Sequence, residues 1–195
     1  MDFPIPRKAG AMLLIEVDGD ANLVSRDARK IREVCREGNA LKFKAATNRQ
    51  EAERLWEARR NVSPSLSKLG PHKISEDVVI PRSRLSDLVT FLGDLSRLHG
   101  LAVPAFGHAG DGNLHVNIML DKNSPRETEK ADEMVRELFQ KVIQMGGTLT
   151  GEHGIGITKA PYLQMEISRA GLEVMTRIKK AFDPRGILNP GKIFV

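Results

Sequence analysis

The sequence predicts an α+β fold in which helices cover one antiparallel sheet. Segments with strand patterns alternate with segments of helical period along the chain. The strands are unevenly spaced, and those predicted at residues 101–106 and 114–120 are separated by only a short Gly-rich turn, as in an antiparallel hairpin. The glycine signatures of a dinucleotide-binding fold and of a P-loop are both missing. These observations favour an α+β sandwich over a parallel nucleotide-binding sheet.

Five segments have the composition and length of strands. The first is a short apolar run that ends at the turn Asp18-Gly19-Asp20, and the second places Leu41 and Phe43 on one face. The third begins at Lys73 and ends before Pro81, and the last two form the predicted hairpin. The predicted strands are residues 11–17, 41–46, 73–80, 101–106 and 114–120.

Five segments are predicted as helices, each with a recognisable beginning or end. Asn48 is a suitable N-cap for the second helix, and Pro125 opens the fourth. Leucines at 3.6-residue spacing mark the third helix, which ends at His99-Gly100. The predicted helices are residues 22–37, 49–60, 83–99, 125–145 and 163–182.

Length and composition restrict the class of protein. The chain has 195 residues, which is the size of one domain, and 41 % of them are hydrophobic. The net charge is +5, but the basic residues are scattered among acidic ones and aromatic residues make up only 5 %, so we expect no nucleic-acid partner. The single cysteine, Cys35, excludes a disulfide framework. We expect a cytoplasmic protein that acts on a small anionic substrate.

The chemistry of the sequence is concentrated in residues 107–117 and 151–156. Three of the five histidines lie in these two Gly-rich stretches. His108 ends one predicted strand and His115 begins its hairpin partner, so both imidazoles can reach one point, where Glu152 would add a carboxylate. Two histidines and one carboxylate form a ligand set that suits Zn, Mn or Fe(II). His153 follows Glu152, would point to the opposite side in an extended chain, and would be placed as a general base.

Other polar residues are ambiguous when they are considered alone. Asn117 interrupts an apolar strand, so its side chain faces either the site or water. Arg59 offers a planar fork that suits a carboxylate, but a cation at a helix end is more often simply solvated. Lys73, at the start of a strand, is equally uninformative by itself.

Together, residues 107–117, 151–156 and 183–192 resemble the C-terminal domain of FAD-linked oxidases. This group includes the FAD subunit of glycolate oxidase, D-lactate dehydrogenase and D-2-hydroxyglutarate dehydrogenase. The resemblance extends over almost the whole chain, with the motifs in the same order. It implies an α+β fold of the ferredoxin-like type and a substrate- and metal-binding C-terminal domain over residues 1–195.

The resemblance also implies roles for particular residues. The chain would oxidise a small 2-hydroxy acid, such as glycolate, D-lactate or D-2-hydroxyglutarate, to the 2-oxo acid. His153 would take the hydroxyl proton as hydride leaves the α-carbon for the flavin. The other implied residues are the Zn or Mn ligands His108, His115 and Glu152, the substrate contacts Arg59, Ser63, Lys73 and Asn117, and one flavin contact, Asn189.

The N-terminal FAD-binding domain of this family has no counterpart in the sequence, which lacks a Gly-rich pyrophosphate loop. We therefore expect the chain to need an FAD-binding domain or subunit as a partner and to be inactive alone. Further oxidase subunits, a homodimer and a peripheral location at the inner face of the membrane are also compatible with the resemblance. Two alternatives stay open: a metal-dependent hydrolase, and a non-catalytic assembly module of an oxidase complex.

Overall fold

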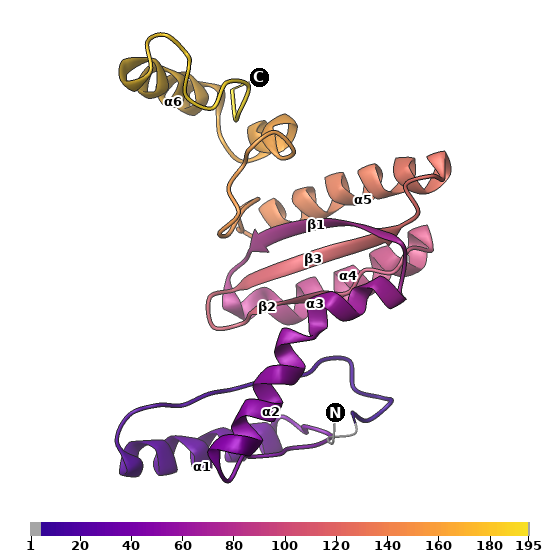
Figure 1. Ribbon diagram of the computed structural model, residues 1–195, viewed down its shortest axis with the longest axis vertical. Helices are drawn as coiled ribbons and strands as arrows, with labels where there is room; N and C mark the ends of the chain where they lie inside the picture. Colours follow the sequence, from indigo (N-terminus) through magenta and orange to yellow (C-terminus); the bar gives the residue numbers. More distant parts are fainter. Residues whose placement is uncertain (1–4, 195) are drawn as a thin grey trace. The chain divides into compact units, whose positions relative to one another are not determined.

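The computed structural model describes residues 5–194. They form two compact units, and the boundary between the units lies between Ser65 and Leu66. The first unit contains α1 (Ala21–Glu37), α2 (Arg49–Arg60) and α3 (Val62–Ser65). The second contains the sheet and the remaining helices (Figure 1). Its elements are η1 (Leu66–Lys68), β1 (His72–Val79), η2 (Arg82–Arg84), α4 (Leu85–His99), β2 (Ala105–His108), β3 (Asn113–Leu120), α5 (Pro125–Gln144), η3 (Ala160–Met165) and α6 (Arg169–Phe182).

The two predicted helices of the first unit are confirmed, but its two predicted strands are wrong. Asp20 and Asn48 cap α1 and α2 with side chains that accept backbone N–H groups. Residues 11–17 and 41–46 have no regular structure, and Leu13 and Leu41 are largely exposed. A strand needs a neighbouring strand for its backbone groups, and the described part of this unit has no sheet to supply one.

The sheet of the second unit has three antiparallel strands in the order β1-β3-β2, which confirms the predicted hairpin. Its first strand begins at Ala105, whereas the sequence predicted residues 101–106. Pro104 has no N–H to donate to a ladder, although its carbonyl accepts the N–H of Asn117. The sequence therefore predicted the pairing of the hairpin correctly and placed its first strand several residues too early.

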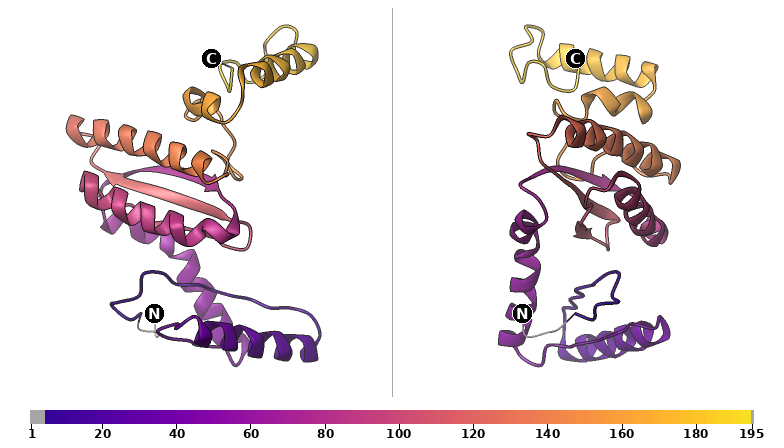
Figure 2. Two further views of the ribbon diagram at one scale, coloured as in Figure 1. Left: turned by 180° about the vertical axis from the view of Figure 1, so that it is seen from behind. Right: turned by 90° about the vertical axis from the view of Figure 1, so that its right-hand side faces the viewer.

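One face of the sheet is apolar and packs against two helices. Figure 2 shows α4 and α5 side by side over this face. Alternate residues of β3 enter the core between the sheet and the helices, which also includes leucines of α4 and the inner face of α5. Gly100 ends α4 with a φ of 73°, as the sequence predicted. The core residues of β3 are Leu114, Val116, Ile118 and Leu120.

The opposite side of the sheet, here called the polar face, carries the candidate site. Register partners in an antiparallel pair project to the same side, and residues two positions apart share a side. The pairs Asp77–His115 and Ser75–Asn117 therefore lie on one face of β1 and β3. His108 pairs with Asn113, which places its side chain on that same face. The polar face carries the apolar Val79 and Met119 together with Lys73, Ser75, Asp77, Phe106, His108, Asn113, His115 and Asn117.

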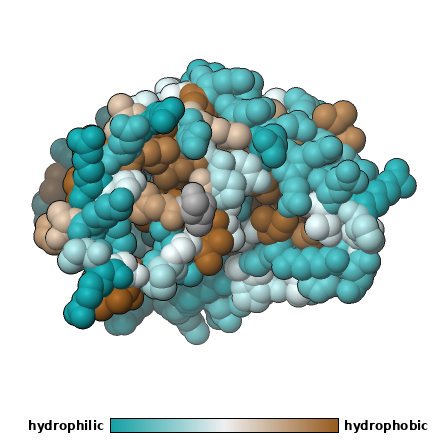
Figure 3. Space-filling view, turned by 90° about the horizontal axis from the view of Figure 1, so that it is seen from above, coloured by the Kyte–Doolittle hydropathy of each residue, from teal (hydrophilic) through white to brown (hydrophobic). Residues whose placement is uncertain are grey.

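The C-terminal part differs from the single predicted helix over residues 163–182. It forms η3 and then α6, which begins because the Ser168 side chain accepts the N–H of Gly171. No residue of α6 is buried, and Val174, Ile178 and Phe182 are exposed. Figure 3 shows apolar patches of the surface between hydrophilic side chains. Among residues 5–194, no helix has the length and apolar character that a membrane span requires.

Candidate metal and catalytic site

His108 and His115 lie diagonally across the β2–β3 hairpin. His115 pairs with Phe106, and His108 lies two residues further along β2. The two imidazole rings meet edge to face, with centroids 5.8 Å apart. Diagonal neighbours in a sheet are within reach of large side chains, so the hairpin register alone brings these two histidines together.

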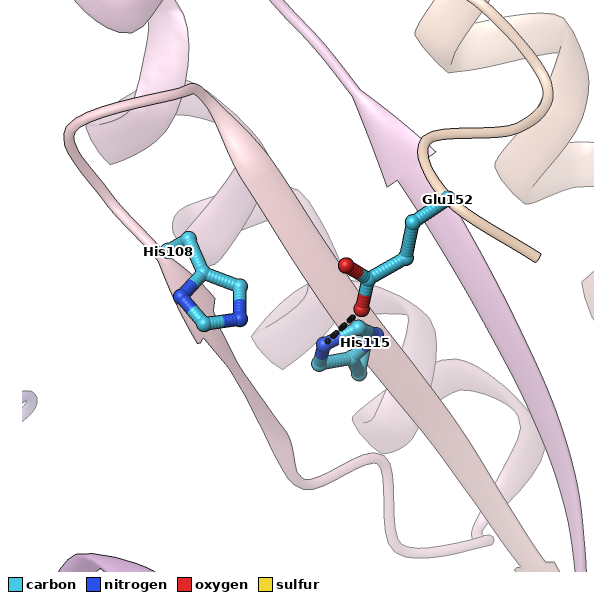
Figure 4. Close-up of side chains that lie close together, drawn as sticks. All are labelled: His108, His115 and Glu152. Carbon is cyan, nitrogen blue, oxygen red and sulfur yellow. Dashed lines mark ion pairs between the residues drawn. The ribbon is translucent and has the colours of Figure 1, made fainter.

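Glu152 adds a carboxylate from a loop that is distant in sequence. One ligand atom from each of His108, His115 and Glu152 lies within 4.8 Å of the other two. Glu152 Oε1 is 3.3 Å from His115 Nε2, and Figure 4 shows all three side chains converging on the polar face. Two imidazoles and a carboxylate are donors that fit a divalent ion such as Zn or Mn.

The surroundings of His115 favour the neutral imidazole. Its side chain is only 10 % exposed, and this burial lowers the pKa of the ring. Glu152 opposes that shift, whereas the neighbouring His153 and His108 reinforce it. A metal binds the unprotonated nitrogen, so the lowered pKa keeps His115 in the form that can act as a ligand. Nδ1 of this ring is buried without a hydrogen-bond partner.

His153 lies on the same side as Glu152, and the prediction that the two would point apart is wrong. The ring of His153 stacks on that of His115, with centroids 5.2 Å apart and planes 12° apart. Its Nε2 is 3.8 Å from Glu152 Oε1. Residues 151–153 form a bend and not an extended strand, so successive side chains need not alternate. The half-exposed His153 ring therefore borders the candidate metal-ligand cluster.

Asp77, which the sequence reasoning missed, anchors this loop. Its side chain is fully buried, and Oδ2 accepts hydrogen bonds from the backbone N–H groups of Gly151, Glu152 and His153 at 2.9, 2.6 and 3.1 Å. The other oxygen, Oδ1, is 3.6 Å from Nδ1 of His153. The bend that presents Glu152 and His153 is thus folded around one carboxylate oxygen.

Lys159 compensates the buried charge of Asp77. Its ammonium donates to Asp77 Oδ1 at 2.7 Å and to the carbonyls of Asp77 and Leu149, both at 2.8 Å. Burial alone would raise the pKa of Asp77, but the bonds from Lys159, Glu152 and His153 hold that pKa well below its usual range. Glu76, also buried, lies 3.6 Å from Lys159, and burial raises its pKa.

Gly151 allows the loop to approach the sheet closely. A β-carbon at this position would lie 1.8 Å from Asn113 Nδ2 and 3.0 Å from Asp77 Oδ2. A side chain of any kind would therefore push the loop away from the polar face. The glycine thus has a packing role next to Glu152 and His153, in addition to the flexibility that its residue type indicates.

The remaining predicted site residues are distributed over both units. Asn117 is fully buried on the polar face, donates to the carbonyl of His115 at 3.1 Å and leaves Oδ1 without a partner. Lys73 lies on the same face at the exposed end of β1. Arg59 and Ser63 belong to α2 and α3 of the first unit. Asn189 is exposed in the C-terminal turn region with a φ of 48°. Their roles toward substrate and flavin remain predictions.

The missed residues left weak signals in the sequence. Glu76 and Asp77 interrupt a strand between the apolar Ile74 and Val78, which is an unusual place for two adjacent acids. Lys159 has no such signal, because a lysine in a polar loop is ordinarily solvated. Lys159 and Asp77 are 82 positions apart in the sequence, and only the three-dimensional structure shows that they are in direct contact.

Comparison with known proteins gives matches along the whole chain. The family described as "FAD linked oxidases, C-terminal domain" matches residues 1–193. The glycolate oxidase subunit GlcD of Bacillus subtilis (strain 168) is 44 % identical over 190 residues, which are 97 % of this chain and 40 % of that protein. The D-2-hydroxyglutarate dehydrogenase of Stutzerimonas stutzeri (strain A1501) is 34 % identical over 74 % of this chain and 32 % of its own length.

A third relative and a solved structure are also similar to this chain. The probable mitochondrial D-lactate dehydrogenase of Danio rerio is 32 % identical over 93 % of this chain and 37 % of its own length. The 4-ethylphenol oxidase of Gulosibacter chungangensis has a similar fold, with a TM-score of 0.53 and 20 % identity over 87 % of this chain and 37 % of that chain. The chain thus spans 40 % or less of the length of each of these proteins.

Proposed function

This chain belongs to the family of FAD-linked oxidase C-terminal domains, and from that membership we propose that it is the substrate- and metal-binding part of an FAD-dependent 2-hydroxy-acid dehydrogenase or oxidase. The relatives it matches are named for glycolate, D-lactate and D-2-hydroxyglutarate. All three are small 2-hydroxy acids, so we propose a substrate of this class.

The observation that carries the proposal is the convergence of His108, His115 and Glu152 beside His153. The first three would hold a divalent metal, and burial lowers the pKa of His115, which favours its neutral form. When bound, the metal would lower the pKa of the substrate hydroxyl and fix its orientation. A site of this kind suits an alcohol that must lose a proton, because the acid and the base are then held side by side.

His153 is the residue that we assign as the base. Its ring is half exposed, borders the metal-ligand cluster, and has Asp77 Oδ1 3.6 Å from its Nδ1. In the proposed reaction its imidazole accepts the hydroxyl proton. The α-carbon loses its hydrogen as hydride, and a 2-oxo acid remains. A bound flavin would supply the hydride acceptor, a capacity that amino-acid side chains lack.

The substrate carboxylate requires a cation, and the family membership supports two residues as separate proposals for that role, Arg59 in the first unit and Lys73 in the second. A guanidinium can hold a carboxylate through two parallel hydrogen bonds, which fixes its orientation. Asn117 would contribute its unpartnered Oδ1, which lies on the same face as Lys73 and His115. Ser63 completes the proposed substrate contacts.

We further propose that the flavin is bound by a region corresponding to the part of the relatives that this chain does not cover. Asn189, in the C-terminal turn region, is the residue of this chain that we propose as a flavin contact. The isolated chain should then neither carry a flavin spectrum nor oxidise a 2-hydroxy acid. The Bacillus subtilis relative is named a subunit, so we also propose that the complete protein works with other oxidase subunits.

A chimera tests the proposal. This chain would replace the matching segment of the Bacillus subtilis glycolate oxidase subunit, with which it is 44 % identical. We expect flavin-dependent oxidation of glycolate, D-lactate or D-2-hydroxyglutarate. His153→Gln should lower turnover by at least about 100-fold. The control is His72→Gln, at the end of β1 that is remote from Asp77, and it should leave turnover unchanged. Flavin-independent hydrolysis of an ester by the isolated chain would contradict the proposal and support a metal-dependent hydrolase.

A further inference from the structure

We propose that Asp77 is a positioning residue, whose carboxylate fixes the bend at residues 151–153 so that Glu152 and His153 face His115. The inference deepens the proposed function and rests on the metal site assigned there. It concerns a residue that would touch neither metal nor substrate. Its role would be to determine whether the third ligand and the base are present at the site at all.

The position of Asp77 follows from the sheet register. It is paired with His115 across β1 and β3, so both side chains leave the sheet on the polar face next to each other. The carboxylate is therefore fixed by two rigid strands beside the buried histidine ligand. Because the two strands hold the carboxylate rigidly beside His115, a loop that binds the carboxylate has a fixed position relative to His115.

The bend is attached to Asp77 by its backbone. The N–H groups of Gly151, Glu152 and His153 all donate to the single atom Oδ2. Three successive backbone N–H groups around one oxygen form an anion-binding concavity, which here encloses a carboxylate of the same chain. The side chain of Glu152 is more than half exposed, so backbone attachment is what orients it.

Both flanks of the bend are tied to the same carboxylate. Lys159, which follows the bend, donates to Asp77 Oδ1 and also to the carbonyl of Leu149, which precedes it. Thr150 Oγ1 donates to Oδ1 at 3.3 Å. Together with the bonds to Oδ2, these contacts hold residues on both sides of the bend, from Leu149 to Lys159, around the carboxylate of Asp77.

Asp77 is not itself available as a ligand. A carboxylate has about four lone-pair positions, and five donors already approach the two oxygens of Asp77. The side chain is also completely buried. These two facts separate a positioning role from direct metal binding, although the residue lies next to the cluster.

The experiment compares Zn²⁺ binding to the full chain with and without this carboxylate. Asp77→Asn preserves the volume but cannot offer an acceptor to both the bend and Lys159. We expect its Zn²⁺ affinity to be lower by about 10–100-fold. The matched control is Asp183→Asn, which removes another buried carboxylate that accepts two backbone N–H groups and a lysine ammonium, those of Ile187, Leu188 and Lys179. This control should leave Zn²⁺ affinity unchanged.

Amide hydrogen exchange provides a readout that does not depend on metal. In the metal-free chain, the amides of Gly151, Glu152 and His153 should exchange faster in Asp77→Asn than in the wild type. Glu152→Gln should leave these amides protected while it weakens Zn²⁺ binding. Adding Asp77→Asn to Glu152→Gln should then weaken binding less than the sum of the two separate effects.

Each result has a distinct meaning. The positioning role requires that the three amides be protected in the wild type. If they are protected there, unchanged exchange in Asp77→Asn would overturn the role, and so, taken separately, would unchanged Zn²⁺ affinity. Absence of Zn²⁺ binding by the wild type would overturn the metal site, while faster exchange in the variant would still support the anchoring of the bend. If Asp77→Asn does not fold, Asp77→Glu keeps the charge beside Lys159 but displaces the acceptor, and it should also show reduced Zn²⁺ affinity. Wild-type affinity in that variant would contradict the proposal.

Discussion

Asp77 and His115 are direct register partners on adjacent antiparallel strands, and both side chains project from the polar face of the sheet. One of them belongs to the candidate metal-ligand cluster, and the other holds the loop that brings Glu152 to that cluster. A single strand pairing thus places one candidate ligand beside the residue that binds the loop of another.

Gly151→Ala should displace the bend that carries Glu152 and His153. The added methyl group would overlap Asn113 Nδ2, which itself lies in a buried strand and cannot move freely. We expect Zn²⁺ affinity to fall by at least about 10-fold, as for other changes that misplace a ligand, when measured by titration calorimetry. The control is Gly110→Ala, in the turn of the β2–β3 hairpin. Its added β-carbon has no neighbour within 4 Å, so this variant should bind Zn²⁺ as the wild type does. Equal affinities for both variants would contradict the close packing of the loop.

Lys159→Met should destabilise the fold strongly. It removes the cation from the fully buried Asp77 and leaves that carboxylate without its charge partner. Breaking a buried ion pair on one side typically costs about 3–5 kcal/mol, which chemical denaturation would detect. Arg169→Met, whose partner Glu173 lies in an exposed pair, should change the free energy of unfolding by less than about 0.5 kcal/mol. A change for Lys159→Met as small as that for Arg169→Met would contradict the stabilising role of the buried pair.

Asp183→Asn should have a pH-dependent effect on stability. The bond from Lys179 is the largest cause that lowers the pKa of Asp183 below its ordinary value of 3.8, with further contributions from the N–H groups of Leu188 and Ile187. A carboxyl whose pKa is lower in the folded state stabilises the fold above its unfolded pKa, and this contribution disappears as pH falls through the folded pKa. The difference in unfolding free energy between wild type and variant should therefore be constant near neutral pH and shrink below about pH 4. A difference independent of pH down to about pH 2 would contradict it.

The sequence was sufficient to predict α1, α2, α4, α5 and the β2–β3 hairpin. Periodicity and caps such as Asn48 and Gly100 are local signals, and the structure confirms both. The strands predicted at residues 11–17 and 41–46 were wrong, because apolar composition reports a tendency to be buried but not the presence of a pairing partner. The break at Ser168 was missed because the apolar spacing continues across it.

The candidate site was predictable only in part. The histidines are recognisable because their spacing matches a tight hairpin, and the register then brings His108 next to His115. The direction of His153 was not predictable, since it depends on the bend at residues 151–153, whose backbone N–H groups bind the carboxylate of the distant Asp77. The contact of Lys159 with Asp77 links distant segments, and no local pattern encodes it.

The most direct measurement is the metal content of the purified chain, compared with that of a His108→Ala/His115→Ala double variant by elemental analysis. We expect about one Zn or Mn per wild-type chain and little or none in the double variant, with both proteins folded by circular dichroism. Equal metal content in the two proteins, or a folded wild type that takes up neither metal when it is supplied in excess, would contradict the proposed site at His108, His115 and Glu152.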